Sequence, residues 1–209
     1  MNDLILSIDT SSSYLGIGLS SNKSNILVFN LYKKNIHDKL LTKYISDLLN
    51  DLDILIQDLS AIAVNIGPGS FTGLRVGISF VKALTLDEKP QIIAVSSTEN
   101  YAYQLRNMNK IIKIFLNSHS NFYYYQSFNE KFESINDCKL VDINDFEFQS
   151  KSDYFLVTDK SDLESDISLN KIEYLMELSR FKFNNSLFTS NDLLIPNYVQ
   201  DFKPKGKTI

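Results

Sequence analysis

The chain has 209 residues, enough for one large domain or two small lobes around a hydrophobic core. Its hydrophobic content of 44%, its charged content of 22% and its net charge of -4 are ordinary for a globular protein and exclude a strongly basic nucleic-acid binder. The one cysteine, Cys138, excludes a disulfide framework and a cysteine metal site, and it fits a reducing compartment.

The two ends of the sequence bear on localisation. The first residues, MNDLILSIDT, include an acidic residue and an apolar run too short for a signal peptide, and no run approaches the length of a membrane span. We therefore expect a cytoplasmic protein without membrane contact. At the other end, Lys203, Lys205 and Lys207 are interpreted as a solvated tail, and a contact between this tail and tRNA stays open.

The opening of the chain predicts three strands and a helix. Residues 4–9, 15–19 and 26–32 are rich in apolar and β-branched residues, which is typical of strands. A hydroxyl-rich turn at residues 10–13 joins the first two strands. A helix is expected at residues 37–50, because one apolar stripe recurs there at helical period: Leu40, Leu41, Tyr44, Ile45, Leu48 and Leu49.

The stretch at residues 61–86, AIAVNIGPGSFTGLRVGISFVKALTL, predicts a short strand, a tight Gly-Pro-Gly turn and a helix. Ser70 or Thr72 is expected to cap that helix. The helix is apolar nearly all round, which predicts burial by its own sheet on one side and by a partner on another. One side near its start carries no side chains and lets another backbone approach closely, because three glycines recur every four residues: Gly69, Gly73 and Gly77.

A fifth strand at residues 91–95 and a helix at residues 97–107, capped by Ser97 or Thr98, complete the first half. The order β-β-β-α-β-α-β-α predicts a mixed sheet with helices on its faces.

The second half repeats the opening of the first. A strand at residues 111–116, a turn at residues 117–120 and a strand at residues 122–128 follow the same plan, with Asn117 where the first copy has Asp9. This weak duplication predicts two related lobes. A strand at residues 154–157 and a helix at residues 171–179 are expected further on, and the rest is irregular.

The sequence gives little support for a catalytic metal site or for a serine nucleophile. The two histidines, His37 and His119, are far apart and neither has a second histidine at helical spacing, so a catalytic metal is not expected. Ser70 lies at a strand–turn–helix junction, but the G-x-S-x-G order of a nucleophile elbow is missing from Gly67-Pro68-Gly69-Ser70-Phe71, so Ser70 is interpreted as a cap.

A phosphate cradle is a stronger hypothesis. The turn after Asp9 and the glycine turn at residues 67–72 both suit anions, although no lysine completes a Walker pattern. Taken singly, a hairpin turn and a capped helix explain them better. Together on one lobe they indicate a nucleotide-type cleft.

The two helices of the first lobe offer another hypothesis. They are adjacent in the βαβ order, so apolar residues kept on their outer faces would form a four-helix interface with a second pair. For the helix at residues 37–50, burial of the whole stripe against the sheet is an equally good interpretation. For the glycine helix it is a poorer one.

Several motifs resemble the TsaB (YeaZ) family of tRNA threonylcarbamoyladenosine biosynthesis proteins: I-D-T-S-S at residues 8–12, G-I-G-L at 16–19, His37, and I-G-P-G-S-F-T-G-L-R-V-G at 66–77. The resemblance spans about residues 4–100. It implies an α/β, actin-like (ASKHA) fold of two RNase-H-like lobes, each a mixed sheet flanked by helices, the second degenerate. We place the lobes at residues 1–106 and 107–209, with the last residues left open to pack back on the first.

The resemblance also implies a function. The family is the non-catalytic paralogue of the metal-binding TsaD, and it acts as a scaffold in forming threonylcarbamoyladenosine beside the anticodon of tRNAs that read codons starting with adenine. TsaD is then the heterodimer partner, the ATPase TsaE joins them, and tRNA is met only through the complex. Alone, the chain is expected to be a homodimer. No catalytic residue, metal or cofactor of its own is implied, and ATP or ADP with magnesium is expected only in the complex.

Two sets of site residues follow from these hypotheses. Weak nucleotide or anion binding is assigned to Asp9, Thr10, Ser11, Ser12, Gly67, Gly69, Ser70 and Thr72. The partner interface is assigned to Leu41, Tyr44, Ile45, Leu48, Gly73, Arg75, Val76, Gly77 and Phe80.

The sequence departs from the family at several positions. Asn117, Ser118 and His119 replace an Asp-Ala-Arg run, residues 157–160 replace a glycine turn, and Asn65 stands where glycine is common. These changes predict that the isolated chain binds ATP weakly or not at all. The alternatives are a stand-alone ASKHA-type ATPase or small-molecule kinase, which would need a complete cleft, and a peptidase, for which ligands and nucleophile are lacking.

Overall fold

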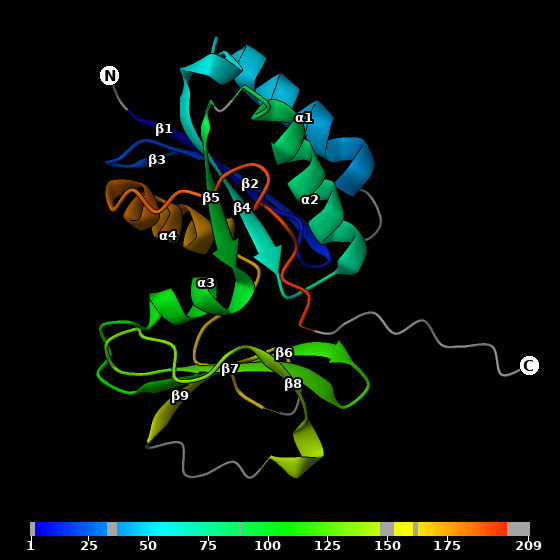
Figure 1. The fold of residues 1–209 in the computed structure, drawn as a ribbon, viewed down its shortest axis with the longest axis vertical. Helices are drawn as coiled ribbons and strands as arrows, with labels where there is room; N and C mark the ends of the chain where they lie inside the picture. The colour runs from blue at the N-terminus through cyan, green and yellow to red at the C-terminus, as the bar shows by residue number, and fades with distance from the viewer. Residues whose placement is uncertain (1–2, 33–36, 88, 147–152, 161–162, 200–209) are drawn as a thin grey trace, which may run out of the picture.

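The structure, a computed structural model, describes residues 3–32, 37–87, 89–146, 153–160 and 163–199, with the side chains of residues 37–39 left out. Two β-sheets lie one beyond the other along the length of the molecule (Figure 1). The first has the order β3-β2-β1-β4-β5 and the second the order β8-β7-β6-β9.

The first sheet is mixed, as expected. β1 pairs antiparallel with β2 and parallel with β4, which in turn pairs parallel with β5. These pairings follow from two short hairpin connections and two helical crossovers. The strand bounds are β1 Leu4–Asp9, β2 Tyr14–Ser20, β3 Asn25–Tyr32, β4 Leu59–Gly67 and β5 Gln91–Ser96.

Helices cover both faces of this sheet (Figure 1). α1 (His37–Asp51) and α2 (Phe71–Leu84) lie on one face, and α4 (Ile172–Asn184) lies on the other. The central strands are buried on both sides, which explains why they read as continuous apolar runs and not as an alternating pattern.

α4 packs unusually close to the sheet, because glycines face it. A Cβ on Gly18 would lie 2.3 Å from the Met176 sulfur, and one on Gly16 would lie 3.0 Å from Ile172. The glycines of the G-I-G-L motif therefore allow α4 to pack closely on the first sheet, although α4 follows the second sheet in the chain.

The second sheet packs against α3 (Ser97–Gln104). Tyr101, Ala102 and Leu105 of this segment lie in one apolar cluster with Ile112 and Ile114. Tyr103 of the same helix lies in the cluster of the first sheet and α4, so α3 belongs to the cores of both halves. The strand bounds are β6 Ile111–His119, β7 Phe122–Phe128, β8 Lys139–Asp142 and β9 Tyr154–Thr158, and two short 3-10 turns lie at Ile56–Asp58 and Ile143–Asp145.

The structure corrects three local expectations. Residues 117–119 belong to β6, because Asn117 pairs with Tyr123, and the chain reverses at Ser120, where φ is 50°. α3 ends at Gln104 and is capped by Ser96, whose side chain accepts from the Glu99 amide, in place of Ser97 or Thr98. β8 was not anticipated.

The segment after α4 returns along the first sheet. The Thr189 amide donates to the Ile92 carbonyl at 2.9 Å, Leu194 is 1% exposed in the core, and the Asn197 amide donates to the Ile66 carbonyl at 2.7 Å. The lobe boundary at residues 106 and 107 remains a prediction, and residues 203–207 lie outside the described part. None of the helices in that part is long and apolar enough to cross a membrane.

Candidate functional site

A cleft of about 1070 Å³ opens between the two sheets, beside the turns that follow β1 and β4 and the end of β6. The first lobe contributes the turn after β1, the glycine turn and the start of α2. The second lobe contributes the end of β6, Tyr124 of β7 and Asp159 after β9, while Asn170 comes from the crossing to α4. The expected nucleotide-type cleft is therefore present as a cavity, and its chemistry depends on how these side chains are engaged.

Asp9 is held by the protein itself. Its carboxylate is 1% exposed and accepts hydrogen bonds from the Ser11 amide at 2.9 Å, the Ser11 hydroxyl at 2.7 Å, the Tyr14 hydroxyl at 2.8 Å and the Asn65 side chain at 3.1 Å. Burial and the neighbouring carboxylate raise the pKa of Tyr14 well above its usual value, so the phenol stays protonated and donates. Asp9 thus holds the turn at residues 10–13 in place through these hydrogen bonds.

The two expected phosphate-binding turns touch each other. The Thr10 hydroxyl donates to the Gly73 carbonyl at 2.7 Å, and the Ser70 amide donates to the Ser11 carbonyl at 2.6 Å. A Cβ on Gly69 would lie 2.3 Å from the Ser11 carbonyl oxygen, and one on Gly73 would lie 2.0 Å from that of Thr10. The glycines therefore allow close contact between the start of α2 and the turn after β1.

Asn170 fixes the Ser12 hydroxyl of the turn after β1. Its side-chain oxygen accepts from the Ser12 hydroxyl at 3.0 Å, its carbonyl accepts from the Tyr32 hydroxyl at 2.9 Å, and its amide donates to the Tyr101 hydroxyl at 3.3 Å. Asn170 has a φ of 57°, a conformation that asparagine tolerates better than most residues. One residue of the crossing segment thereby joins three elements at the base of the cleft.

The wall from the second lobe carries an acidic group. The Asp159 carboxylate accepts a hydrogen bond from the Asn117 amide at 2.7 Å. Partial burial raises the pKa of Asp159, and backbone hydrogen bonds oppose that rise. This wall disfavours an anion.

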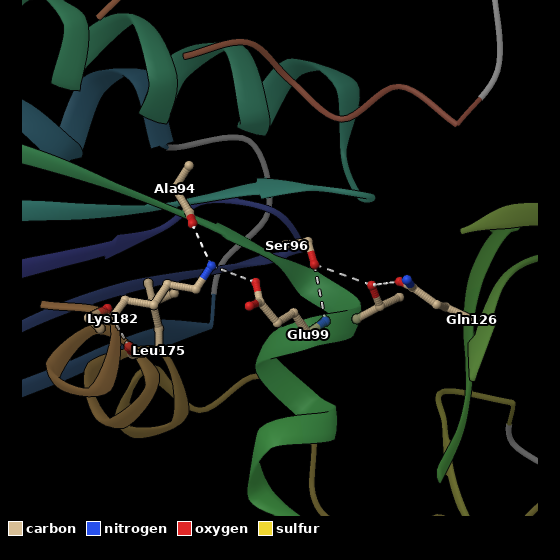
Figure 2. Close-up of polar contacts among 8 residues, drawn as sticks. Ala94, Ser96, Glu99, Gln126, Leu175 and Lys182 are labelled. Carbon is tan, nitrogen blue, oxygen red and sulfur yellow. Dashed lines mark hydrogen bonds and ion pairs between the residues drawn. The ribbon is translucent and has the colours of Figure 1, made fainter. Parts of the chain in front are cut away.

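A polar chain links the lobes behind the cleft, from α4 through α3 to β7 (Figure 2). The Lys182 ammonium donates to the Ala94 carbonyl at 3.1 Å and to the Glu99 carboxylate at 2.8 Å. Further along, the Thr98 hydroxyl donates to the side chain of Gln126 at 2.5 Å. Together with the apolar packing of α3, these contacts hold the two walls in register.

Magnesium nucleotide does not fit the residues present. Asp9 is enclosed and fully engaged, and among the described residues no group of three or more His, Cys, Asp or Glu side chains could hold a metal ion. Within the same described part, no lysine, arginine or histidine lines the cleft to neutralise phosphates. The anion-binding assignment of the two turns is thus not supported by their geometry.

Three of the four assigned partner residues of α1 are in the core. Leu41, Ile45 and Leu48 are at most 8% exposed and pack with the first sheet. Gly73 and Gly77 are likewise covered, since their bare side faces Thr10. These five residues are not on an open surface, because the apolar stripe of α1 and the glycine side of α2 are satisfied within the chain.

The outward side of α2 does present apolar and charged groups. Val76 and Phe80 of α2, with Tyr44 of α1, are half-buried and pack partly against the first core cluster, and Arg75 is exposed. The Arg75 guanidinium lies 3.8 Å from the centre of the Phe71 ring, and its Nε donates to the Tyr198 hydroxyl at 2.9 Å. Arg75 therefore anchors the returning C-terminal segment beside α2.

Comparison with known proteins places the chain in a family. A family model described as TsaD, tRNA N6-adenosine threonylcarbamoyltransferase, matches residues 33–148. The TsaB protein of Bacillus subtilis is 41% identical over 108 residues, which is 52% of this chain and 47% of that protein. The chain belongs to the TsaB (YeaZ) branch of this family.

Other relatives agree. The TsaB protein of Escherichia coli K12 is 31% identical over 93 residues, covering 44% of this chain and 40% of that protein. This TsaB-family chain matches about half the length of its curated relatives. YeaZ from Pseudomonas aeruginosa superposes with a TM-score of 0.77 at 19% identity, over 94% of this chain and 99% of that one. The expected actin-like fold is thus confirmed.

Sequence reasoning missed four residues that shape the site of this TsaB-family chain. Tyr14, Tyr101 and Asn170 hold the cleft turn in place, and Tyr198 holds Arg75. The stacking of Tyr14 on Tyr32 across the β2–β3 pair was readable from strand pairing. The other contacts join segments too distant in sequence for any local pattern to reveal.

Proposed function

We propose that this chain is a non-catalytic subunit in the biosynthesis of threonylcarbamoyladenosine in tRNA, acting as a scaffold for a TsaD paralogue. The observation that carries the proposal is the 41% identity to the Bacillus subtilis protein named for this pathway. The engagement of Asp9 by its own chain supports a role without catalysis, because the group best placed to hold a metal or water has no free face. In this proposal tRNA and TsaE are met only through the complex.

The contact surface proposed is the outward side of α2. Arg75, Val76 and Phe80 lie there, with Tyr44 of α1 beside them. Half-buried apolar side chains on a helix that already packs on its sheet are suited to helix–helix contact with a related subunit or, in its absence, with a second copy of the chain. Any ATP or ADP with magnesium is then bound by other members of the complex.

A stand-alone ATPase or kinase of the same fold is the alternative. It would need an acidic group free to hold magnesium and cations for the phosphates. Asp9 and the described lining of the cleft speak against it.

The test is association with the TsaD paralogue, measured by size-exclusion chromatography and interferometry on the full chain. We expect a complex at micromolar concentration. Ser79→Glu and Ala83→Glu add charges on the exposed side of α2 and should weaken it by about tenfold or more each, since an interface core excludes unpaired charge.

Asn184→Glu, an exposed position at the end of α4 on the opposite face of the sheet, is the matched control and should bind like the wild type. Circular dichroism checks that each variant is folded. Absence of a complex at micromolar concentration would contradict the scaffold role, and equal binding by all three variants would contradict the α2 surface.

A further inference from the structure

We infer that the turn between β7 and β8, residues 129–133, is a strained latch that fixes the spacing of the two lobes. The Phe132 ring is the part of this latch that enters the core of the first lobe. The latch is independent of the scaffold role proposed above, because it concerns how the lobes of the isolated chain are held.

The backbone of Phe132 is the first observation. Its φ is 64°, in the left-handed region. A side chain with a Cβ is unfavourable there, and a bulky aromatic residue in this region is an outlier. Such a conformation persists only where the surrounding structure enforces it, and it is characteristic of clamps and switch regions. Phe132 therefore holds strain that is released when its ring leaves its site.

The contacts of the ring are the second observation. Phe132 packs against the apolar cluster of the first sheet and α4 and also against that of the second sheet. Its ring centre lies 5.4 Å from that of Tyr103 of α3, edge-on, and 5.6 Å from that of Phe128 of β7, nearly parallel. Both are favourable arrangements of aromatic pairs. A turn of the second lobe is thus packed into the core of the first.

The turn behind the ring is closed on itself. The Asn129 amide donates to the Glu133 carbonyl at 2.8 Å, and the Phe132 amide donates to the Asn129 carbonyl at 3.0 Å. The Asn129 side-chain oxygen accepts from the Lys131 and Glu133 amides, each at 2.9 Å, and its nitrogen donates to the Glu133 carboxylate at 2.7 Å. All of these bonds lie within the latch, so it can leave the first lobe as a unit without breaking them.

The position of the latch connects it to the cleft. Tyr101 lines the cleft, whereas Tyr103 of the same helix contacts Phe132 outside the cleft lining. With the ring seated, the second lobe is fixed on α3. With the ring released, Phe132 returns to an ordinary φ and the second lobe can tilt on α3, which changes the width of the cleft. Because relief of strain offsets part of the lost packing, the two states are close in free energy.

Double electron–electron resonance on the full chain measures the lobe spacing. Spin labels at Ser46→Cys on α1 and Asn121→Cys between β6 and β7 occupy exposed positions, with Cys138→Ser removing the native thiol. With Phe132 present we expect one narrow distance. Phe132→Gly should add a second distance, its population raised about tenfold or more, and Phe132→Leu should lie between the two. Circular dichroism checks that each variant is folded.

The control for spacing is Ile135→Gly, an exposed apolar residue two positions after the latch, which should keep the single distance. A distance distribution unchanged in Phe132→Gly, or changed equally in Ile135→Gly, would overturn the inference.

A second comparison tests the strain separately. Phe132→Ala and Phe132→Gly both lose the ring, but only glycine relieves the backbone, so the glycine variant should unfold at the higher urea concentration. At Ile135, whose φ is not positive, the order should be reversed, with alanine the more stable. If alanine at position 132 is as stable as glycine or more so, the turn holds no strain and is not a latch.

Discussion

Asp9 shows how a residue with the sequence signature of a ligand site can be a structural anchor. An ionised carboxylate in a nearly inaccessible position is tolerable only if its oxygens accept hydrogen bonds. Here both oxygens do so, from three residues that include Tyr14 and Asn65. The sequence suggested a role in holding phosphate or metal-bound water, whereas the geometry assigns Asp9 to the support of the turn above it.

Removing one of these donors should therefore destabilise the fold. Tyr14→Phe keeps the buried ring but leaves one carboxylate oxygen with the Asn65 side chain as its remaining donor. We expect a loss of about 1.5–3 kcal/mol in the free energy of unfolding, the range for hydrogen bonds to charged groups. Urea denaturation followed by circular dichroism measures it.

The matched control is Tyr44→Phe. Tyr44 is half-buried against Phe29, and its hydroxyl has no hydrogen bond within the described part of the chain. Its loss should change stability by less than about 0.5 kcal/mol. Equal effects of the two substitutions would show that Tyr14 contributes only its ring.

At the scale of elements, the sequence was most informative where a pattern is local. The glycine turn, the apolar period of α2 and the strand–turn–strand opening identified β1, β2, β4 and α2, because their signals lie within the elements themselves. β8 was missed because Lys139–Asp142 is short and half-exposed, and pairing with β7 is what makes it a strand.

The orientation of surfaces was the harder problem. Gly73 was correctly read as a site of close backbone approach, but the approaching backbone is that of Thr10, 63 residues earlier in the chain. A helical wheel gives the shape of a face and not the identity of what covers it. For the same reason the stripe of α1 was divided between sheet and partner, whereas Leu41, Ile45 and Leu48 all face the core.

The contact at Gly73 should be sensitive to a single methyl group. In Gly73→Ala the new Cβ would lie 2.0 Å from the Thr10 carbonyl oxygen, which is backbone and cannot step aside alone. The gain of about 1 kcal/mol in helix propensity does not offset this overpacking. We expect a net loss of about 1–3 kcal/mol in unfolding free energy.

Gly18→Ala provides the comparison. Its Cβ would meet the Met176 side chain, an adaptable thioether, so the cost should be clearly smaller than at Gly73. Thermal or urea unfolding of both variants measures the difference. A larger loss at Gly18 would mean that α4 is less adaptable than the turn after β1.

At the scale of the molecule, the two sheets are joined through elements that belong to both. α3 packs on the second sheet while its start is bonded to β4 and α4, and α4 comes after the second sheet in the chain but packs on the first. We therefore expect the two cores to unfold cooperatively, because disturbing either helix disturbs both.

The Lys182–Glu99 pair is the polar centre of this connection. The two side chains are 13% and 27% exposed, and the ammonium also serves the Ala94 carbonyl of β5. Lys182→Met fills similar volume but leaves a largely enclosed carboxylate and a carbonyl without this donor. We expect a loss of about 1–3 kcal/mol, below the value for a fully buried pair because solvent reaches Glu99.

Urea unfolding followed by far-ultraviolet circular dichroism and by tyrosine fluorescence measures both the loss and the cooperativity. The control is Arg180→Met, two positions before Lys182 on the same helix. It removes an exposed hydrogen bond to Asn25 and should cost less than about 0.5 kcal/mol. Since α4 and α3 join the two cores, both probes should shift together in Lys182→Met. If instead the two probes separate, the pair holds the lobes in contact without coupling their folding.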